Sequence, residues 1–180
     1  REVLRTAFDA MYQDEQEMLS LYDKMADAAP EELDKMMARV GEIQSELEQS
    51  GFYTLDSKIE EFANGLGLGE IGLDKDVAQL SGGQRSKVLL AKLLLQNSSI
   101  LLLDEPTNYL DVEHIEWLTK FLQNYENAFI LISHDIPFLN KVVNVIYHLE
   151  DCQLTRYSGN YDKFQELHAI YVAQKESAYQ

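Results

Sequence analysis

The feature that most constrains the fold is a pair of short, wholly apolar segments, residues 100–103 and 128–132, each followed by polar or charged residues. Both are too short for independent helices and have the composition of buried strands. Amphipathic helical patterns over residues 81–96 and 113–125 alternate with them. Apolar strands that alternate with helices predict an α/β fold with a parallel sheet covered by helices on both faces.

The remaining C-terminal residues continue this alternation. A short helix around residues 137–142 leads to a predicted strand at 145–149, and Glu150-Asp151 turns the chain into another strand at 153–157. After Ser158-Gly159-Asn160 the pattern is helical to the end of the chain.

Residues 1–50 have a different pattern, in which apolar side chains recur at intervals of three and four. Two such stripes, separated by a break that ends at Pro30 and stopped at Gly51, predict an antiparallel helical hairpin. The first stripe comprises Leu4, Phe8, Met11, Met18, Tyr22 and Met25, and the second Leu33, Met36, Val40, Ile43 and Leu47.

The charge balance excludes some partners. The net charge is −16, and the first 80 residues carry 19 acidic against seven basic side chains. Such a chain does not bind nucleic acid or anionic membrane through bulk electrostatics. A single cysteine, Cys152, cannot form an internal disulfide, and neither a signal sequence nor a membrane span is found, so we expect a cytoplasmic location and no membrane partner.

A glycine-rich segment after the short helix at residues 55–66 contains a formal G-x-G-x-x-G from Gly67 to Gly72. A dinucleotide-binding motif needs a strand before it and a helix after it. Here a helix precedes and a turn follows, so we interpret the segment as a loop.

The first candidate ligand-binding segment is Leu80-Ser81-Gly82-Gly83-Gln84, which begins a helix. Glycines leave backbone N–H groups uncovered, Ser81 adds a hydroxyl, and the helix dipole favours an anion such as a phosphate. The simpler interpretation is a serine N-cap followed by flexible glycines.

Two further candidate sites follow the apolar strands. Asp104 and Glu105 form a carboxylate pair, of which one can help to hold Mg²⁺ and the other can position a water molecule. His134 can donate a hydrogen bond to a terminal phosphate. In each case a purely structural role is the alternative. The other histidines, His114, His148 and His168, lack metal-ligand spacing and are interpreted as structural.

Taken in order, these segments resemble the nucleotide-binding domain of the ATP-binding cassette (ABC) superfamily. Residues 80–84 resemble its signature motif, 100–105 its Walker B strand, Leu110-Asp111 its D-loop and His134 its switch histidine. The resemblance implies ATP and Mg²⁺ as ligands. It also implies these roles: catalysis by Glu105 and His134; water-mediated Mg²⁺ binding by Asp104; and contacts with ATP from Ser81, Gly82, Gly83, Gln84 and Asp111.

Three features are similar to the ABC-F proteins. Residues 105–111 read E-P-T-N-Y-L-D, close to the E-P-T-N-H-L-D of that family; the hairpin stands where ABC-F proteins insert an arm; and residues 157–161 resemble their Y-x-G-N-Y. The resemblance implies a soluble ATPase with paired nucleotide-binding domains that acts on the ribosome, in translation regulation or antibiotic protection. Its contacts there would be with rRNA, tRNA or ribosomal proteins.

On this interpretation the chain divides into an arm-like hairpin (1–50), a helical subdomain with the signature (51–96), the Walker B and switch part of the core (97–157) and the start of a linker helix (158–180). No G-x-x-x-x-G-K-[ST] occurs, so we expect a partial P-loop NTPase domain that does not hydrolyse ATP alone. A second nucleotide-binding domain of the same protein is its expected partner. Uncovered sheet edges also predict self-association.

Three alternatives remain. The chain could belong to the ATP-binding subunit of a membrane ABC transporter, which would not need the Y-x-G-N-Y segment. It could belong to a DNA-repair or chromosome-maintenance ATPase, but the coiled coils of those proteins are far longer than the ~40 Å spanned by helices of this length. It could also be a binding module in which the hairpin makes the functional contacts.

Overall fold

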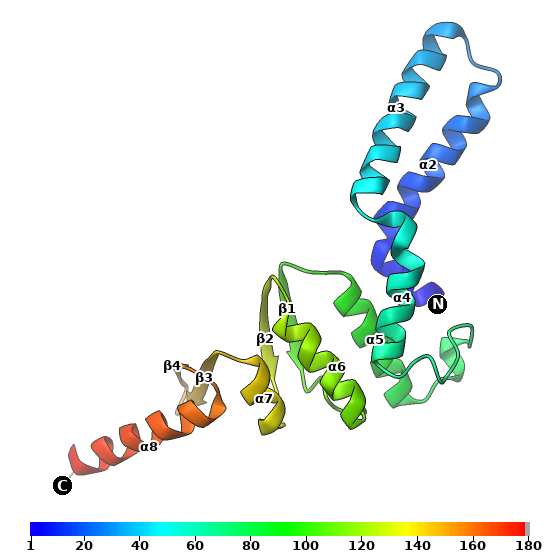
Figure 1. Cartoon of the computed structure of the whole chain (residues 1–180). Coiled ribbons are helices and arrows are strands. Elements are labelled where there is room, and N and C mark those ends of the chain that lie inside the picture. Colours follow the sequence, from blue (N-terminus) through cyan, green and yellow to red (C-terminus); the bar gives the residue numbers. More distant parts are fainter. Residues whose placement is uncertain (179–180) are drawn as a thin grey trace. The chain divides into compact units, whose positions relative to one another are not determined.

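The computed structural model describes residues 1–178, and the chain divides into two compact units, Arg1–Ser98 and Ser99–Gln180 (Figure 1). The first unit is helical in its described elements, and the second combines strands and helices. The elements of the first unit are α1 (Glu2–Arg5), η1 (Thr6–Phe8), α2 (Asp9–Met25), α3 (Pro30–Gln49), η2 (Phe52–Thr54), α4 (Leu55–Gly65), η3 (Val77–Gln79) and α5 (Gly82–Leu95).

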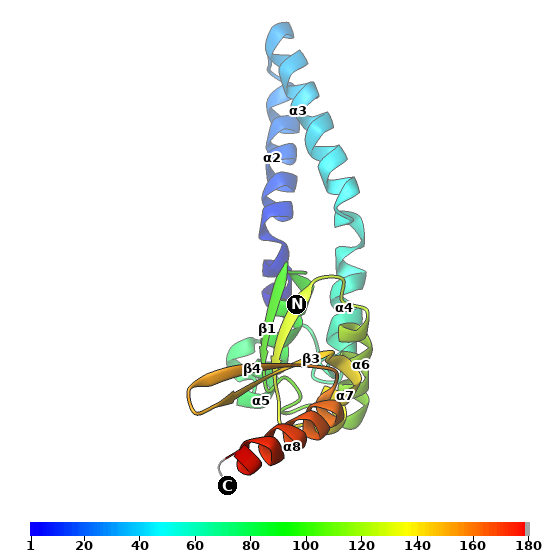
Figure 2. The same ribbon diagram turned by 90° about the vertical axis from the view of Figure 1, so that its left-hand side faces the viewer.

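The predicted hairpin is present as α2 and α3, which lie side by side and antiparallel (Figures 1 and 2). Three apolar side chains of α3 are buried, Val40, Ile43 and Leu47. Arg39 of α3 forms a two-pronged ion pair with Glu17 of α2, at 2.8 and 3.1 Å. Because this pair is exposed, apolar packing rather than charge contributes most to holding the hairpin together.

Two details of the first helix were wrongly predicted. The helix expected over residues 1–27 is interrupted by the 3₁₀ turn η1, within which the Thr6 hydroxyl donates to the carbonyl of Val3 at 2.6 Å. Tyr22, expected on the packed stripe, is 48% exposed, whereas Leu21 is half-buried. The spacing from Met18 to Leu21 and then Met25 keeps the three-and-four rhythm on the packed face.

The glycine-rich loop is the end of a helix, as its sequence context predicted. The Leu68 amide donates to the Ala63 carbonyl at 2.7 Å, and the Gly67 amide to the Asn64 carbonyl at 3.0 Å. Gly67 has a φ of +75°, in the left-handed region that glycine adopts at little cost. Since α4 precedes this loop and no strand does, the dinucleotide-binding interpretation is excluded.

The second unit contains the strands that the sequence predicted. The strands β1 and β2 pair in parallel, with a register that runs from Ile100↔Ala128 to Asp104↔Ile132. The elements of the second unit are β1 (Ile100–Asp104), α6 (Val112–Gln123), β2 (Ala128–Ile132), α7 (Ile136–Val142), β3 (Val145–Glu150), β4 (Gln153–Ser158) and α8 (Tyr161–Ala178).

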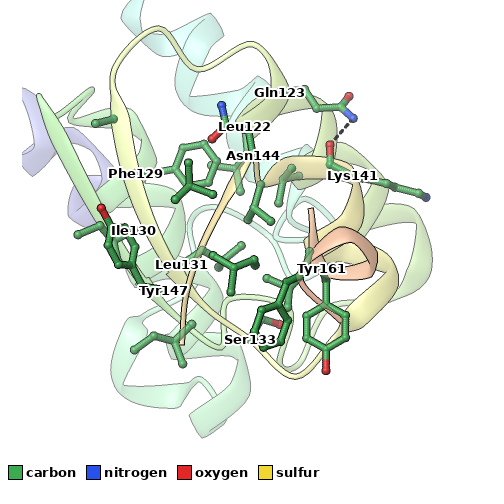
Figure 3. Close-up of a pocket in the computed structure, with 18 of the residues that line it drawn as sticks. Leu122, Gln123, Phe129, Ile130, Leu131, Ser133, Lys141, Asn144, Tyr147 and Tyr161 are labelled. Carbon is green, nitrogen blue, oxygen red and sulfur yellow. Dashed lines mark hydrogen bonds between the residues drawn. The ribbon is translucent and has the colours of Figure 1, made fainter. Parts of the chain in front are cut away.

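The pairing of the strands differs from the prediction. The strands β3 and β4 form an antiparallel hairpin of their own, which is not hydrogen-bonded to β1 and β2. A cavity of about 1170 Å³ lies between β2 and β3, with Leu131 and Tyr147 among its lining residues (Figure 3). At its rim the side chain of Gln123 donates to the carbonyl of Lys141 at 3.0 Å, joining α6 to α7.

The prediction that helices cover both faces of the parallel sheet is wrong for the residues that the structure describes. Leu101 and Leu103 are buried on one face. On the other face, Leu102 is 65% exposed and Ile130 is 61% exposed. Strand side chains alternate between faces, so this second face is a contiguous apolar surface in contact with solvent.

This exposed face predicts that the 180-residue chain self-associates, because contact between copies removes apolar area from water. Light scattering across a concentration series should show an average mass that rises above the monomer value. Lysine at positions 102 and 130 (Leu102→Lys, Ile130→Lys) should return the mass towards the monomer. Leu19→Lys, at an exposed apolar position on α2, is the matched control and should leave association unchanged. A chain that stays monomeric at high concentration would contradict the prediction.

Candidate functional site

The main candidate site lies where β1 and β2 end. Carboxyl ends of parallel strands meet at one edge of a sheet, and ligands of open α/β sheets bind there. The ladder extends one residue beyond β1, because the Glu105 amide donates to the Ile132 carbonyl at 2.8 Å. This bond places Glu105 next to the segment that follows β2, which carries Ser133 and His134.

Glu105 and His134 are in direct contact. Nδ1 of His134 lies 2.8 Å from Oε2 of Glu105, and the backbone amide of His134 donates to the same oxygen at 3.3 Å. The His134 side chain is 78% exposed and that of Glu105 is 28% exposed. The carboxylate is therefore held at two points, while the outer side of the imidazole remains open to solvent.

The backbone at Glu105 is strained. Its φ is +47°, a left-handed conformation that costs a side-chain-bearing residue about 1–2 kcal/mol. The Asn108 amide donates to the Glu105 carbonyl at 3.1 Å, which closes a tight turn directly after the strand. This turn aims the carboxylate at His134, so the strain accompanies a specific placement of a polar group.

The contact shifts both protonation equilibria. The hydrogen bond from His134 holds the pKa of Glu105 below its usual value of 4.5, against a smaller opposing effect of desolvation. The hydrogen bond with Glu105, followed by its negative charge, raises the pKa of His134 above 6.5. Near neutral pH the site therefore favours an ionised carboxylate beside a protonated or readily protonated imidazole.

The other residues of this region are exposed polar groups. Asp104, the last residue of β1, is exposed on the same face as Leu102. Asp111 occupies the N-cap position of α6 without a side-chain capping hydrogen bond. Carboxylate oxygens are the protein ligands that Mg²⁺ prefers, so exposed Asp104 at the strand end is chemically suited to a Mg²⁺ ion held directly or through water.

The segment Ser81–Gln84 has the geometry of a helix start. Ser81 is the N-cap of α5, and its hydroxyl accepts from the Gln84 amide at 3.2 Å. The Gln84 side chain accepts in turn from the Ser81 amide at 3.0 Å, which completes a capping box. The helix-capping role that the sequence offered as the simpler interpretation is therefore present. Capping accounts for Ser81 and Gln84 but not for the glycines between them.

Gly82 is the informative residue of this segment. A Cβ atom added at Gly82 would meet no other atom within 4 Å, and the residue is exposed. Neither packing nor a left-handed φ requires glycine at this position. An uncovered backbone at the N-terminus of a 14-residue helix instead matches the requirements of an approaching anion.

The structure thus groups the predicted residues in two places. Ser81, Gly82, Gly83 and Gln84 lie together in the unit Arg1–Ser98. Asp104, Glu105, Asp111 and His134 lie in the unit Ser99–Gln180.

One cluster was missed by the sequence analysis. His148, Glu150 and His168 each offer a ligand atom, and these atoms all lie within 4.8 Å of one another. Glu150 and His168 are 18 positions apart in the sequence, so their spacing did not indicate a cluster. The signal that could have revealed it is the His-x-Glu spacing, because residues two apart on a strand share a face. The sequence analysis ended the strand at residue 149 and assigned Glu150 to the turn, whereas β3 includes Glu150.

The family of the chain follows from comparison with known proteins. Residues 4–108 match the family described as ABC transporter, and the fold is that of an ABC ATPase domain. The chain belongs to this family. It is 18% identical to a solved structure titled "Structure of ATP binding subunit of ABC transporter", with a TM-score of 0.53 over 63% of this chain and 48% of that chain, a likeness of fold.

Two relatives are more similar in sequence. The chain is 59% identical over 179 residues to the ABC transporter ATP-binding protein YfmM of Bacillus subtilis (strain 168), covering 99% of this chain and 35% of YfmM. It is 37% identical over 141 residues to the probable ATP-binding protein YheS of Escherichia coli (strain K12), covering 78% of this chain and 22% of YheS. The chain thus spans about a third of YfmM and less of YheS.

Among the described residues, no helix has both the length and the apolar character that crossing a membrane requires.

The contact between Glu105 and His134 predicts a measurable titration. The His134 pKa should lie above 6.5 in the chain and return towards that value in Glu105→Gln, because an amide removes the negative charge. The stabilisation from the raised pKa is fully present below pH 6.5 and is lost as pH rises through the folded-state pKa of His134. The stabilisation of the folded state from the lowered pKa of Glu105 is present above pH 4.5, and it is lost as pH falls through the folded-state pKa of Glu105.

The measurement is an NMR titration of the four histidine rings, with the His134 signal assigned from a His134→Asn variant. Glu113→Gln, which changes an exposed carboxylate in the first turn of α6, is the matched control and should leave the His134 pKa in place. An identical His134 pKa in the wild-type chain and Glu105→Gln would show that the contact does not persist in solution.

Proposed function

We propose that this chain is part of an ABC-F ATPase, which binds and hydrolyses ATP in the full-length protein and couples hydrolysis to ribosome binding. The observation that carries the ATPase part is the contact between Glu105 and His134 where two parallel strands end. A carboxylate and an imidazole that hold each other at this edge suit the positioning of water and the sensing of a terminal phosphate.

The proposed roles follow from the chemistry of each group. Glu105 is ionised near neutral pH, and its contact with His134, which lowers its pKa, further favours the carboxylate. In this form it accepts a hydrogen bond from the attacking water and orients it. His134, with its pKa raised and its outer face exposed, donates a hydrogen bond towards the phosphate. Asp104 would hold Mg²⁺ through water, and the ion would neutralise charge on the phosphates.

The residues Ser81–Gln84 and Asp111 serve a nucleotide in a different way. The uncovered N-terminus of α5 suits the terminal phosphates of ATP held by a second nucleotide-binding domain of the same protein. Asp104, Glu105 and His134 would serve the nucleotide held by a P-loop, a motif that residues 1–180 do not contain. On this proposal the chain contributes to two ATP sites and hydrolyses no ATP alone.

Three features support the ABC-F assignment over other ABC proteins. The helices α2 and α3 form a hairpin upstream of Ser81–Gln84, where the resemblance to ABC-F proteins implies an arm. Residues 105–111 and 157–161 have the resemblance described above. In the second of these segments, Gly159 has a φ of +122° and its amide donates to the Asn144 carbonyl at 2.8 Å, while Asn160 caps α8 by accepting from the Lys163 amide. The segment thereby directs the chain from β4 into α8, the proposed start of the linker.

The principal alternative is the ATP-binding subunit of a membrane ABC transporter. The family match and the likeness to the structure of such a subunit favour it as much as they favour ABC-F. Its nucleotide chemistry would be the same, so activity alone does not distinguish the two. The difference lies in the partner, a ribosome or a membrane-embedded subunit.

The role of Gly82 can be tested against a second glycine. Gly82→Ala should lower ATP turnover of the full-length protein at least tenfold, because a Cβ covers the backbone that the phosphates approach, while leaving the free energy of unfolding almost unchanged. Gly41→Ala, on the exposed side of α3 and also in open space, is the matched control. It should raise stability by about 0.5–1 kcal/mol and leave turnover unaltered.

The measurements are steady-state phosphate release and urea unfolding of each variant. Full turnover in Gly82→Ala would remove the nucleotide role proposed for the α5 N-terminus. Loss of turnover in Gly41→Ala would show that the assay reports misfolding instead.

The partner can be tested by ribosome co-sedimentation. In the full-length protein, Glu105→Gln together with the matching change in the second domain should slow hydrolysis and trap the ATP-bound form. This variant should pellet with ribosomes when ATP is present and remain in the supernatant without it. Deletion of the α2–α3 hairpin should weaken pelleting but leave ATP binding intact. A trapped protein that binds ATP and stays in the supernatant would favour the transporter alternative.

A further inference from the structure

The face of the β3–β4 hairpin that α8 covers carries a cluster of metal-ligating side chains. His148 and Glu150 are two residues apart on β3, so their side chains leave the strand on the same face. α8 packs against this hairpin and brings His168 to the same place. One ligand atom from each residue lies within 4.8 Å of the others.

The two imidazoles are held in place by their neighbours. The His148 ring contacts the His168 ring, with centroids 4.6 Å apart, and also the buried ring of Phe164, at 5.2 Å. The hydroxyl of Tyr157 lies 3.3 Å from Nδ1 of His168. When Nδ1–H donates to this hydroxyl, Nε2 carries the lone pair that binds a metal ion.

We propose that His148, Glu150 and His168 form a binding site for a divalent transition-metal ion of the zinc type. Two imidazoles and one carboxylate are a ligand set that zinc accepts, with water in the fourth position. A hard ion such as Mg²⁺ would prefer oxygen ligands, so the imidazoles select against it. Both histidines are half-buried and Glu150 is exposed, which leaves a path by which the ion enters.

The three side chains need only a small movement to reach the geometry of a zinc site. Ligands at 2.0–2.2 Å around a tetrahedral ion are roughly 3.4 Å from one another. The ligand atoms lie within 4.8 Å of one another, so side-chain rotations that move each atom by about 1 Å bring them to the distances that the ion requires. Glu150, at the exposed end of β3, has the freedom for this movement.

Metal binding would fix α8 on the β3–β4 hairpin. A pair of hydrogen bonds between Asn140 of α7 and Asp162, at 2.9 and 3.0 Å, holds the start of α8. An ion shared by β3 and His168 adds a cross-link two turns further along α8. The site is separate from Glu105 and His134, so the proposal does not depend on the ATPase assignment.

The test is a Zn²⁺ titration of the untagged 180-residue chain, first freed of metal with a chelator and then followed by isothermal titration calorimetry. We expect one equivalent of Zn²⁺ to bind. Glu150→Gln and His168→Asn should each weaken binding at least tenfold. His114→Asn, which removes an imidazole on α6 outside the cluster, is the matched control and should bind as the wild-type chain does.

A second readout is hydrogen exchange, in which Zn²⁺ should slow exchange of the α8 amides in the wild-type chain and not in Glu150→Gln. Failure of the wild-type chain to bind one equivalent overturns the proposal. So does undiminished binding in Glu150→Gln, or equal weakening in His114→Asn. Glu150 is exposed and glutamine has the same shape as glutamate, so Glu150→Gln is expected to fold. This variant therefore tests the proposal even if the circular dichroism spectrum of His168→Asn shows that it is unfolded.

Discussion

The parallel pairing of β1 and β2 is the interaction on which the candidate ATPase site depends. Its register, from Ile100↔Ala128 to Asp104↔Ile132, brings the two strand ends to the same level. The bond from the Glu105 amide to the Ile132 carbonyl carries that register into the loop and so sets the 2.8 Å contact with His134. A slip of one residue would reverse the faces of β1 and separate the two side chains.

The second unit is incompletely covered in the residues that the structure describes. Alternation along β1 buries Leu101 and Leu103 but leaves Leu102 in solvent. The cavity between β2 and β3 further separates the two small sheets. The site therefore combines a well-defined polar edge with an apolar face that is open to a further layer.

Features that depend on neighbouring residues were predicted well. The N-cap at Ser81, the helix end at Gly67 and the start of α3 at Pro30 each follow from contacts within a few positions along the chain. Features that depend on packing between elements distant in the sequence were predicted less well. The predicted cover of the sheet was wrong, and the 3₁₀ turn at Thr6–Phe8 was not predicted. The catalytic roles of Glu105 and His134 stay predictions.

By itself, the sequence determined the main helices and strands, the α/β class and the polar residues that follow each strand, because hydrophobic period, caps and turn residues act over short distances. Only the tertiary structure decided which distant side chains meet. His134 reaches Glu105 across 29 residues, and His168 joins His148 and Glu150, through strand pairing and helix packing that no local pattern specifies. The physical reason is that these contacts depend on the register and direction of whole elements, which are set by the packing of the entire unit.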